Sequence, residues 1–279
     1  MSLIWRCGRH EIVCGERTLV MGILNPTPDS FSDGGQLATV EAALERAVHM
    51  VGDGADILDV GGESTRPGSE PVDEEDEIDR VVPVIERIVE AMPDVPVSVD
   101  TRKASVAAEA LRAGASIVND VSSGGDPEMF GVVSGHGAGM VLMHMLGEPK
   151  TMQEDPFYDD VVDDVHAYLD GKIEAASAAG IDRESLCIDP GIGFGKTLDH
   201  NLRLMKEVAG FLDLGRPLLV GPSRKRFIGT LLDVEVDERM EGTAGAVAWL
   251  GSHGVHVVRV HDVKEMVRVV RVVDAIGGA

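Results

Sequence analysis

Polar residues that could bind a small ligand recur immediately after short apolar runs of the sequence. One group of them consists of two carboxylates and an amide, Asp100, Asn119 and Asp189. Because each follows an apolar run, its side chain is expected to be desolvated, and an unpaired carboxylate is costly there. A planar aminated heterocycle, with several N–H donors and acceptors, would satisfy all three. The alternative is that individual members only cap helices or tie loops together.

A second group of residues at the ends of such runs is cationic. It comprises Arg66, Lys225, Arg259 and His261, with Asn25 at the end of an earlier run. Arg and Lys bind phosphate through charge-assisted hydrogen bonds, so this group predicts an anionic ligand such as phosphate or diphosphate. Asn25 could also ligate Mg²⁺, which usually takes few protein ligands together with substrate phosphate and water. The alternative is that these cations form salt bridges with nearby Asp residues.

Motifs for several other chemistries are incomplete. Gly191–Thr197 (GIGFGKT) is similar to a phosphate-binding P-loop, but Pro190 stands where the first glycine is required. Ser223 lies in GPSRK, which is not the GxSxG turn of a hydrolase, and the sequence motif offers it no His or Asp partner. The chain has no HExxH motif and no Cys/His cluster, which argues against a zinc site.

Eight runs rich in Val, Ile and Leu carry these polar residues at, or shortly after, their carboxyl ends. They are Leu19–Asn25, Ile57–Gly62, Val97–Thr101, Ile117–Ser122, Met140–His144, Leu186–Gly191, Leu218–Ser223 and Val255–Asp262. Such runs are typical of parallel strands covered by helices, and helical periodicity lies between them, as in Val40–Asp53 and Asp159–Ala179. Eight strand–helix units predict an α/β fold, the (β/α)₈ TIM barrel, with the polar residues at the carboxyl ends of its strands. An open doubly wound sheet is the alternative, but it would gather polar residues at one switch point.

The segment before the first strand and the chain length complete the expected architecture. Ile4–Thr18 alternates around Gly8 and Gly15, which predicts a β-hairpin that closes the bottom of the barrel. A single barrel usually takes about 250 residues, so the 279 residues leave no room for a second domain. Residues 1–279 are therefore expected to form one domain.

Composition narrows the classes of partner and the location. The 48 acidic and 25 basic residues give a net charge of −23, which argues against nucleic acid or an anionic membrane as the main partner. No apolar run reaches the ~20 residues of a membrane span, and Met1–His10 is not expected to be a signal peptide. Cys7, Cys14 and Cys187 form no CxxC pair, which fits a reducing cytoplasm. The acidic, lysine-poor composition indicates either adaptation to high salt or simply a very soluble enzyme.

Eight segments of the chain resemble, in order and spacing, the motifs of a known family. They are Met21–Gly35 (MGILNPTPDSFSDGG), Asp59–Gly68 (DVGGESTRPG), Ser98–Arg102 (SVDTR), Val118–Gly124 (VNDVSSG), Leu142–Gln153 (LMHMLGEPKTMQ), Asp189–Lys196 (DPGIGFGK), Gly221–Gly229 (GPSRKRFIG) and Arg259–Val263 (RVHDV). Over about residues 19–263 the chain resembles the dihydropteroate synthases, which are pterin-binding TIM barrels of folate biosynthesis. The resemblance implies a transferase that joins 6-hydroxymethyl-7,8-dihydropterin diphosphate to 4-aminobenzoate and releases diphosphate.

The resemblance also implies a role for each matching residue. The pterin would be held by Asp100, Asn119, Met143, Asp189, Lys225 and Arg259. The 4-aminobenzoate pocket would be formed by Phe31, Thr65, Pro67, Phe194 and Ser223. Diphosphate would bind Asn25, Thr65, Arg66, Arg259 and His261, with Mg²⁺ on Asn25. The catalytic set would be Asp100, Asp189, Lys225, Arg66, Arg259 and His261.

Two alternatives remain open within the resemblance. A protein like the methyltetrahydrofolate methyltransferases would share the Asp/Asn pterin clamp, but it would not need the STRPG and SRKR segments present here. A pterin-binding paralogue without catalysis is the other alternative. Barrels of the family are usually homodimers, and the helical segments Met240–Ser252 and Val263–Ile276 offer apolar faces for such an interface.

Overall fold

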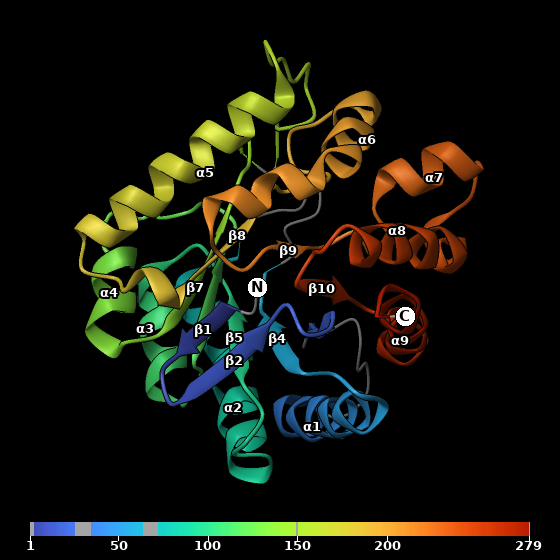
Figure 1. The fold of residues 1–279 in the computed structure, drawn as a ribbon. Coiled ribbons are helices and arrows are strands. Elements are labelled where there is room, and N and C mark those ends of the chain that lie inside the picture. The colour runs from blue at the N-terminus through green and yellow to red at the C-terminus, as the bar shows by residue number, and fades with distance from the viewer. Residues whose placement is uncertain (1–2, 26–34, 64–71, 149, 279) are drawn as a thin grey trace.

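Parallel strands form a barrel with helices around it in the computed structural model, which describes residues 3–25, 35–63, 72–148 and 150–278 (Figure 1). In these ranges the barrel strands are β3 (Leu19–Leu24), β4 (Ile57–Gly61), β5 (Val97–Asp100), β6 (Ile117–Asp120), β7 (Gly139–Met143), β8 (Leu186–Asp189), β9 (Leu219–Val220) and β10 (Val257–Val260). Their order is β8-β7-β6-β5-β4-β3-β10-β9, and a bridge between Ile188 and Leu218 joins the two edges. The predicted TIM barrel is confirmed, and the open sheet is excluded.

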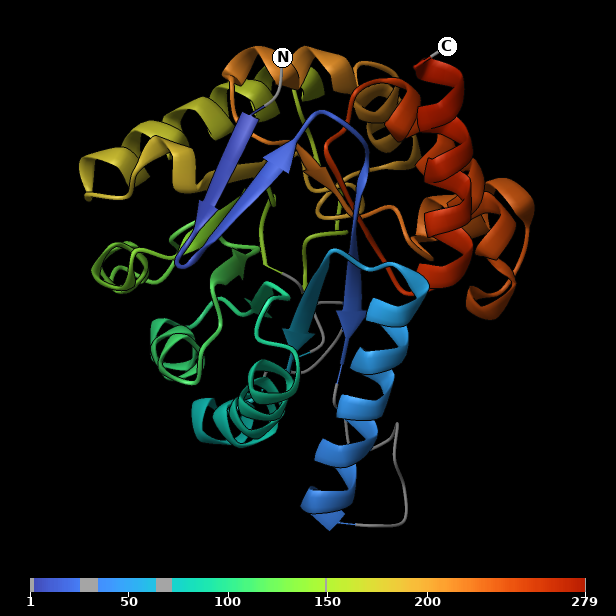
Figure 2. The same ribbon diagram turned by 60° about the horizontal axis from the view of Figure 1, so that its bottom comes forward.

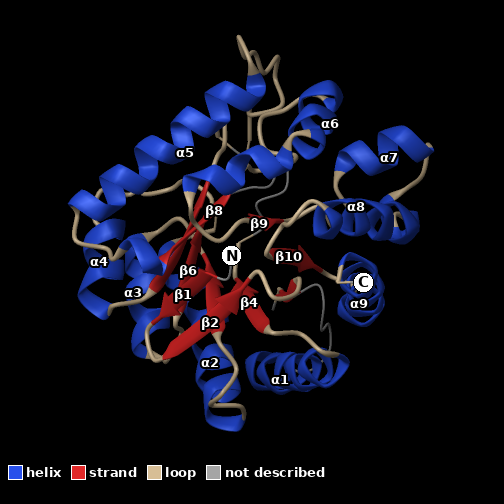
Figure 3. Cartoon of the chain, in the orientation of Figure 1, coloured by secondary structure: helices blue, strands red, loops and turns tan. Residues whose placement is uncertain are grey.

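Helices cover the outer face of the strands on all sides (Figure 3). They are α1 (Gly35–Asp53), α2 (Glu74–Ala91), α3 (Ala104–Arg112), α4 (Met129–His136), α5 (Val161–Ala178), α6 (Leu198–Lys206), α7 (Arg226–Leu232), α8 (Met240–Ser252) and α9 (Val263–Gly277). The helices predicted over Val40–Asp53 and Asp159–Ala179 are α1 and α5. Asp160 begins α5, because its side chain accepts hydrogen bonds from the first backbone amides of the helix.

The alternation of side chains along each strand explains where the polar residues lie. The lower interior of the barrel is apolar and contains Met21, Ile57, Ile117, Val141, Cys187, Leu219 and Val257. Successive side chains on the same face of a strand are two residues apart. The next inward positions on six of these strands are therefore Asp59, Asn119, Met143, Asp189, Gly221 and Arg259. The same two-residue period that fills the floor thus places the polar residues above it.

A β-hairpin closes the amino ends of the barrel strands, as predicted. It consists of β1 (Leu3–Cys7) and β2 (His10–Cys14), which pair antiparallel. Trp5 is fully buried against the apolar floor, and its indole N–H donates to Ser185 O at 3.0 Å. Figure 2 shows the hairpin lying across this end of the strands. Within the described residues, no helix is both long and apolar enough to cross a membrane.

Candidate active site

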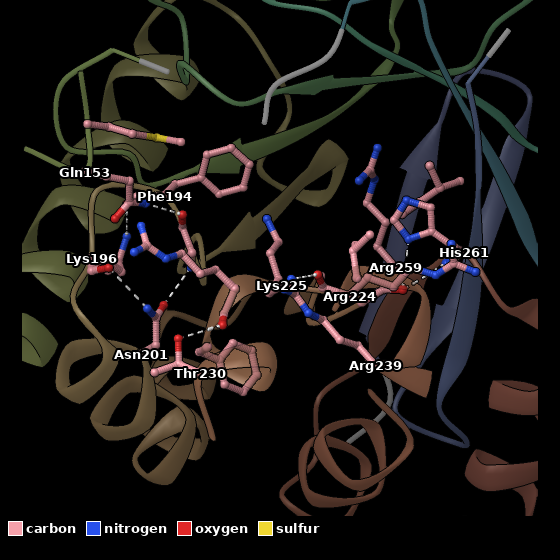
Figure 4. Close-up of a pocket in the computed structure, with 18 of the residues that line it drawn as sticks. Gln153, Phe194, Lys196, Asn201, Arg224, Lys225, Thr230, Arg239, Arg259 and His261 are labelled. Atoms are coloured by element: carbon pink, nitrogen blue, oxygen red, sulfur yellow. Dashed lines mark hydrogen bonds between the residues drawn. The ribbon is translucent and has the colours of Figure 1, made fainter. Parts of the chain in front are cut away.

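A cavity of about 760 Å³ opens at the carboxyl ends of the barrel strands. Its wall combines apolar residues with cationic and acidic side chains from the loops after several strands. Figure 4 shows Gln153, Phe194, Lys196 and Asn201 on one side of it, Lys225 in the middle, and Arg259 and His261 on the other side. A concave site of this size with convergent polar groups is typical of small-molecule binding.

Arg259 is the centre of a buried ion-pair network across the barrel interior. Its Nε donates to Asp59 Oδ2 at 2.6 Å, and its Nη2 donates to Asp100 Oδ2 at 2.6 Å. Asn119 Nδ2 donates to the same Asp59 oxygen at 3.1 Å. Side chains from β4, β5, β6 and β10 are therefore fixed relative to one another. The sequence left open whether Arg259 binds an anionic ligand or forms salt bridges with nearby Asp residues. The structure shows the salt bridges, and they lie inside the candidate site.

Asp100 retains an oxygen that a ligand could use. Burial raises the pKa of Asp100 to about 7, although the Arg259 guanidinium opposes the shift, and the negative charge of Asp59 adds to it. Asp100 Oδ1 is buried and has no hydrogen-bond partner among the described residues, and the same holds for Asp59 Oδ1 and Ser98 Oγ. Because unpaired buried acceptors are costly, an incoming N–H donor would be stabilised at Asp100.

Asp189 on β8 is a second buried carboxyl of this interior. Burial raises its pKa to about 6, opposed by a hydrogen bond from the backbone N–H of Gly191 at 2.7 Å and by the charge of Lys225. Both acids thus have raised pKa values in the absence of a ligand. Donors from a bound heterocycle would favour their ionised forms.

The loop after β8 is built from glycines in left-handed conformation. Gly191, Gly193 and Gly195 have φ values of 68°, 86° and 62°. A Cβ on Gly193 would lie 2.9 Å from Lys225 Cδ, so a side chain there would displace this lysine. The loop brings the Phe194 ring beneath Lys225, whose Nζ lies 3.9 Å from the ring centroid in a cation–π contact. The GIGFG sequence therefore shapes an aromatic wall, consistent with its failure to match a P-loop.

Ser223 has a histidine neighbour that its sequence motif does not reveal. Its Oγ lies 2.9 Å from His261 Nδ1 and accepts a hydrogen bond from the backbone N–H of His261 at 3.2 Å. The sequence motif does not indicate this partner, because the loops after β9 and β10 adjoin only in the folded barrel. Arg224 is ion-paired to Asp262, with contacts of 2.5 and 3.1 Å, which joins the same two loops.

Asn25 is the one described residue expected to hold a metal. It lies on the cavity wall at the end of β3, and a Cβ on Gly61 would lie 3.1 Å from Asn25 Oδ1 and 3.4 Å from Asp100 Cβ. Within the described ranges, no group of three or more His, Cys, Asp or Glu residues could hold a metal ion. A single amide oxygen fits a Mg²⁺ ion that takes most of its ligands from diphosphate and water, and it does not fit a metal held by protein ligands alone.

The structure brings together the described residues of the predicted site. Those that line the cavity are Asn25, Asp100, Phe194, Ser223, Lys225, Arg259 and His261. Asn119 and Asp189 belong to the inward layer of the barrel, and Met143 packs in a cluster with Val121, Met152 and Phe194. Phe31, Thr65, Arg66 and Pro67 lie outside the described residues.

Sequence reasoning assigned no role to three residues that organise the site. Asp59 holds Arg259, and only its place at a strand end signals this. Lys103 Nζ lies 2.6 Å from Glu63 and 2.5 Å from Glu77 and contacts Val72 O at 2.7 Å, which joins the chain on either side of residues 64–71. Lys196 is buried in the cavity wall, and the one sequence feature that points to it is its place at the end of the glycine-rich motif.

Comparisons with known proteins agree with this geometry. Residues 21–261 match the family model described as pterin binding enzyme. The chain is 49% identical over 263 residues to the dihydropteroate synthase of Bacillus subtilis, covering 94% of this chain and 89% of that protein. It is 48% identical over 243 residues to the Escherichia coli dihydropteroate synthase, covering 87% and 86%. A solved structure of the Xanthomonas albilineans dihydropteroate synthase with 4-aminobenzoic acid superposes with a TM-score of 0.93 at 43% identity, covering 100% of both chains.

Proposed function

The chain belongs to the dihydropteroate synthases of the pterin-binding enzyme family, and from this premise we propose how its barrel performs their reaction. That reaction joins 6-hydroxymethyl-7,8-dihydropterin diphosphate to 4-aminobenzoate, forms 7,8-dihydropteroate and releases diphosphate, and it is a transferase step of folate biosynthesis. The single observation that carries the assignment of roles is the Asp59–Arg259–Asp100 network with the unpartnered Asp100 oxygen.

The pterin binds in the inward layer of the barrel in this proposal. Asp100, Asn119 and Asp189 provide acceptors and a donor for the edge of the heterocycle, and Lys225 provides a further donor. The pterin N–H groups would satisfy Asp100 Oδ1, which has no partner among the described residues. Met143 and the Arg259 guanidinium would pack on the ring faces, and Asp59 would hold Arg259 while it does so.

The 4-aminobenzoate binds between the loops after β8 and β9. Phe194 supplies an aromatic wall beneath Lys225, and Ser223 supplies a hydroxyl that His261 orients. We assign Phe31, Thr65 and Pro67 to the same pocket on the resemblance of their motifs.

Diphosphate binds the basic residues at the mouth of the barrel. We assign it to Asn25, Arg259 and His261, and on motif resemblance to Thr65 and Arg66. Mg²⁺ bound to Asn25 and to diphosphate oxygens would neutralise charge on the leaving group. Although the chain has a net charge of −23, Arg66, Arg259 and His261 would form a locally basic site that receives an anionic substrate.

The transfer step breaks the C–O bond to diphosphate and forms a C–N bond to the aminobenzoate amine, which then loses a proton. As diphosphate leaves with the bonding electrons, positive charge develops on the pterin methylene. The carboxylates Asp100 and Asp189 favour that charge, while Arg66 and His261 stabilise the leaving diphosphate. The arylamine is itself nucleophilic, so the mechanism requires no general base.

Assembly and location follow the family in this proposal. Exposed apolar residues lie on α8 and α9, where Trp249, Val272 and Ile276 are 44%, 60% and 73% exposed, and they support a homodimer. We place the enzyme in the cytoplasm, as its sparse, unpaired cysteines favour. Sedimentation analysis would measure the mass of the assembly.

A diphosphate-release assay with matched variants tests the assigned roles. Release should require both substrates, and Lys225→Ala or Asp100→Asn should lower kcat/KM by about a hundredfold, as removal of one transition-state contact does. Lys264→Met, which removes an exposed lysine from α9, is the control and should retain full activity. Equal rates in the wild type and both site variants would reject these roles.

A further inference from the structure

Lys196 is a buried lysine of the cavity wall that joins two loops. It follows the glycine-rich loop after β8, and its side chain reaches back to the end of β7. Its Nζ lies 2.9 Å from His144 Nδ1, 3.4 Å from His144 O and 2.9 Å from Phe194 O. The residue is 3% exposed. The Lys196 amino group therefore links the chain after β7 to the backbone of Phe194.

His144 is held in a single orientation for this contact. The ring of Tyr168 meets it edge-on with centroids 4.8 Å apart, and the ring of Tyr158 lies 5.9 Å away. Tyr158 OH donates to Gly195 O at 2.8 Å, so the same assembly also holds the glycine-rich loop. Burial and the adjacent Lys196 charge lower the pKa of His144 to about 3, and burial lowers the pKa of Lys196 to about 7. The neutral imidazole therefore shares a hydrogen bond with Lys196 Nζ through Nδ1.

Phe194 depends on external contacts for its position. Its neighbours Gly193 and Gly195 both have positive φ values, and glycine gives a backbone little stiffness of its own. Lys196 fixes the Phe194 carbonyl, and Lys225 contacts the Phe194 ring with its ammonium 3.9 Å from the centroid. Figure 4 shows Lys196 and Lys225 near Phe194, with Lys225 in the middle of the cavity.

We propose that Lys196 is a positioning residue for 4-aminobenzoate. By binding His144 and the Phe194 carbonyl together, it fixes the Phe194 ring as one wall of the aminobenzoate pocket. The inference rests on the proposed role of Phe194 in that pocket. Lys196 does not touch the reacting atoms, and its side chain hydrogen-bonds to His144 and Phe194. Its influence on the pterin subsite is its charge, which opposes the burial that raises the pKa of Asp189.

The Lys196→Met variant tests this role through a comparison of two substrates. Methionine keeps much of the apolar stem but donates no hydrogen bonds. The KM for 4-aminobenzoate should rise about tenfold, the expected size for loss of the hydrogen bonds to His144 Nδ1 and Phe194 O. Binding of the pterin diphosphate, measured by calorimetry, and its KM should change several-fold less than the KM for 4-aminobenzoate, because Lys196 acts on the pterin subsite through its charge near Asp189 and not through a hydrogen bond. Lys264→Met controls for the loss of one positive charge.

His144→Phe provides an independent test from the other end of the contact. Phenylalanine preserves an aromatic ring between Tyr158 and Tyr168 but removes the Nδ1 acceptor, so the same selective rise in KM is expected. If Lys196→Met does not fold, as judged by circular dichroism, His144→Phe decides alone. An equal change in both KM values, or no change in the KM for 4-aminobenzoate, would overturn the inference. A wild-type chain that forms no dihydropteroate would instead refute the proposed function.

Discussion

Two buried carboxyls of the candidate site, Asp100 and Asp189, have raised pKa values. Burial raises their pKa values to about 7 and about 6, because the protein interior penalises the charged form. Arg259 and Lys225 oppose these shifts but do not cancel them. Ionising these buried carboxyls costs free energy, and N–H donors of a bound pterin would offset that cost by hydrogen-bonding to the carboxylate oxygens.

Asp100→Asn should change how the stability of the folded protein depends on pH. The pKa of Asp100 is about 7 when folded, whereas an unfolded Asp titrates near ~4. The folded protein therefore binds this proton more tightly, and the resulting stability is present below about pH 4 and is lost as the pH rises through about 7. The variant lacks this loss, so its thermal midpoint relative to the wild type should be higher at pH 8 than at pH 5.

Calorimetry of the ligand-free proteins measures both midpoints. Asp237→Asn, at an exposed carboxylate, is the matched control and should show no pH-dependent difference. A midpoint difference for Asp100→Asn that is the same at both pH values would contradict the raised pKa. The variant should also bind the pterin diphosphate more weakly, because it replaces an acceptor with a donor at one oxygen.

Among the elements, the loop after β8 is anchored by hydrogen bonds on both sides of Gly193. Gly193 has a φ of 86°, its N–H donates to Asn201 Oδ1 at 2.6 Å, and its carbonyl accepts from Gln153 Nε2 at 2.8 Å. The loop is thus anchored on both sides while it carries Phe194. Glycine is required both by the left-handed backbone and by the approach of Lys225.

Gly193→Ala should damage stability and aminobenzoate binding together. The added Cβ would lie 2.9 Å from Lys225 Cδ, and a left-handed alanine costs about 1–2 kcal/mol, so the free energy of unfolding should fall by at least that amount. Urea unfolding measures it. Gly171→Ala, in α5 with nothing within 4 Å of the new Cβ, is the control and should be stabilising by about 0.5–1 kcal/mol. Equal effects of the two substitutions would contradict this account of the loop.

The strands and helices follow from the sequence, whereas several contacts of the site do not. Eight apolar runs with helical periodicity between them predict the barrel, and the place of Asp100 at the end of one run predicts that it lies at the carboxyl ends of the strands, because these features depend on local pattern. The Ser223–His261 contact joins loops 38 residues apart, and its pairing depends on the closure of β9 against β10. The reach of Lys196 to His144 depends on the folded path of a glycine-rich loop, which no periodicity specifies.

At the scale of the whole molecule, most of the acidic charge lies away from the site. The buried carboxylates among the described residues are Asp59, Glu77, Asp100, Asp120 and Asp189. The chain has 48 acidic residues in all, so most of them face solvent. Some are placed favourably, such as the exposed Glu74 and Glu75 in the first turn of α2, where the helix dipole favours negative charge. The net charge of −23 is therefore mainly a property of the surface and not of the ligand site.

Salt should stabilise the folded chain if the exposed carboxylates of its surface repel one another. Screening shortens the range of repulsion between exposed carboxylates, from about 10 Å at 0.1 M to about 3 Å at 1 M salt. We expect the thermal midpoint to rise between low and molar KCl. A sucrose series, which stabilises by exclusion from the surface without screening charge, is the control. No gain with KCl beyond the sucrose effect would show that the acidity serves solubility alone.

The stoichiometry of the products tests whether this chain joins the pterin to 4-aminobenzoate. Purified protein is incubated with 6-hydroxymethyl-7,8-dihydropterin diphosphate and Mg²⁺, with and without 4-aminobenzoate, and both products are quantified by mass spectrometry and a diphosphate assay. We predict one 7,8-dihydropteroate for each diphosphate released, and negligible release without the amine. Diphosphate release that is independent of 4-aminobenzoate, or the absence of dihydropteroate, would contradict the account.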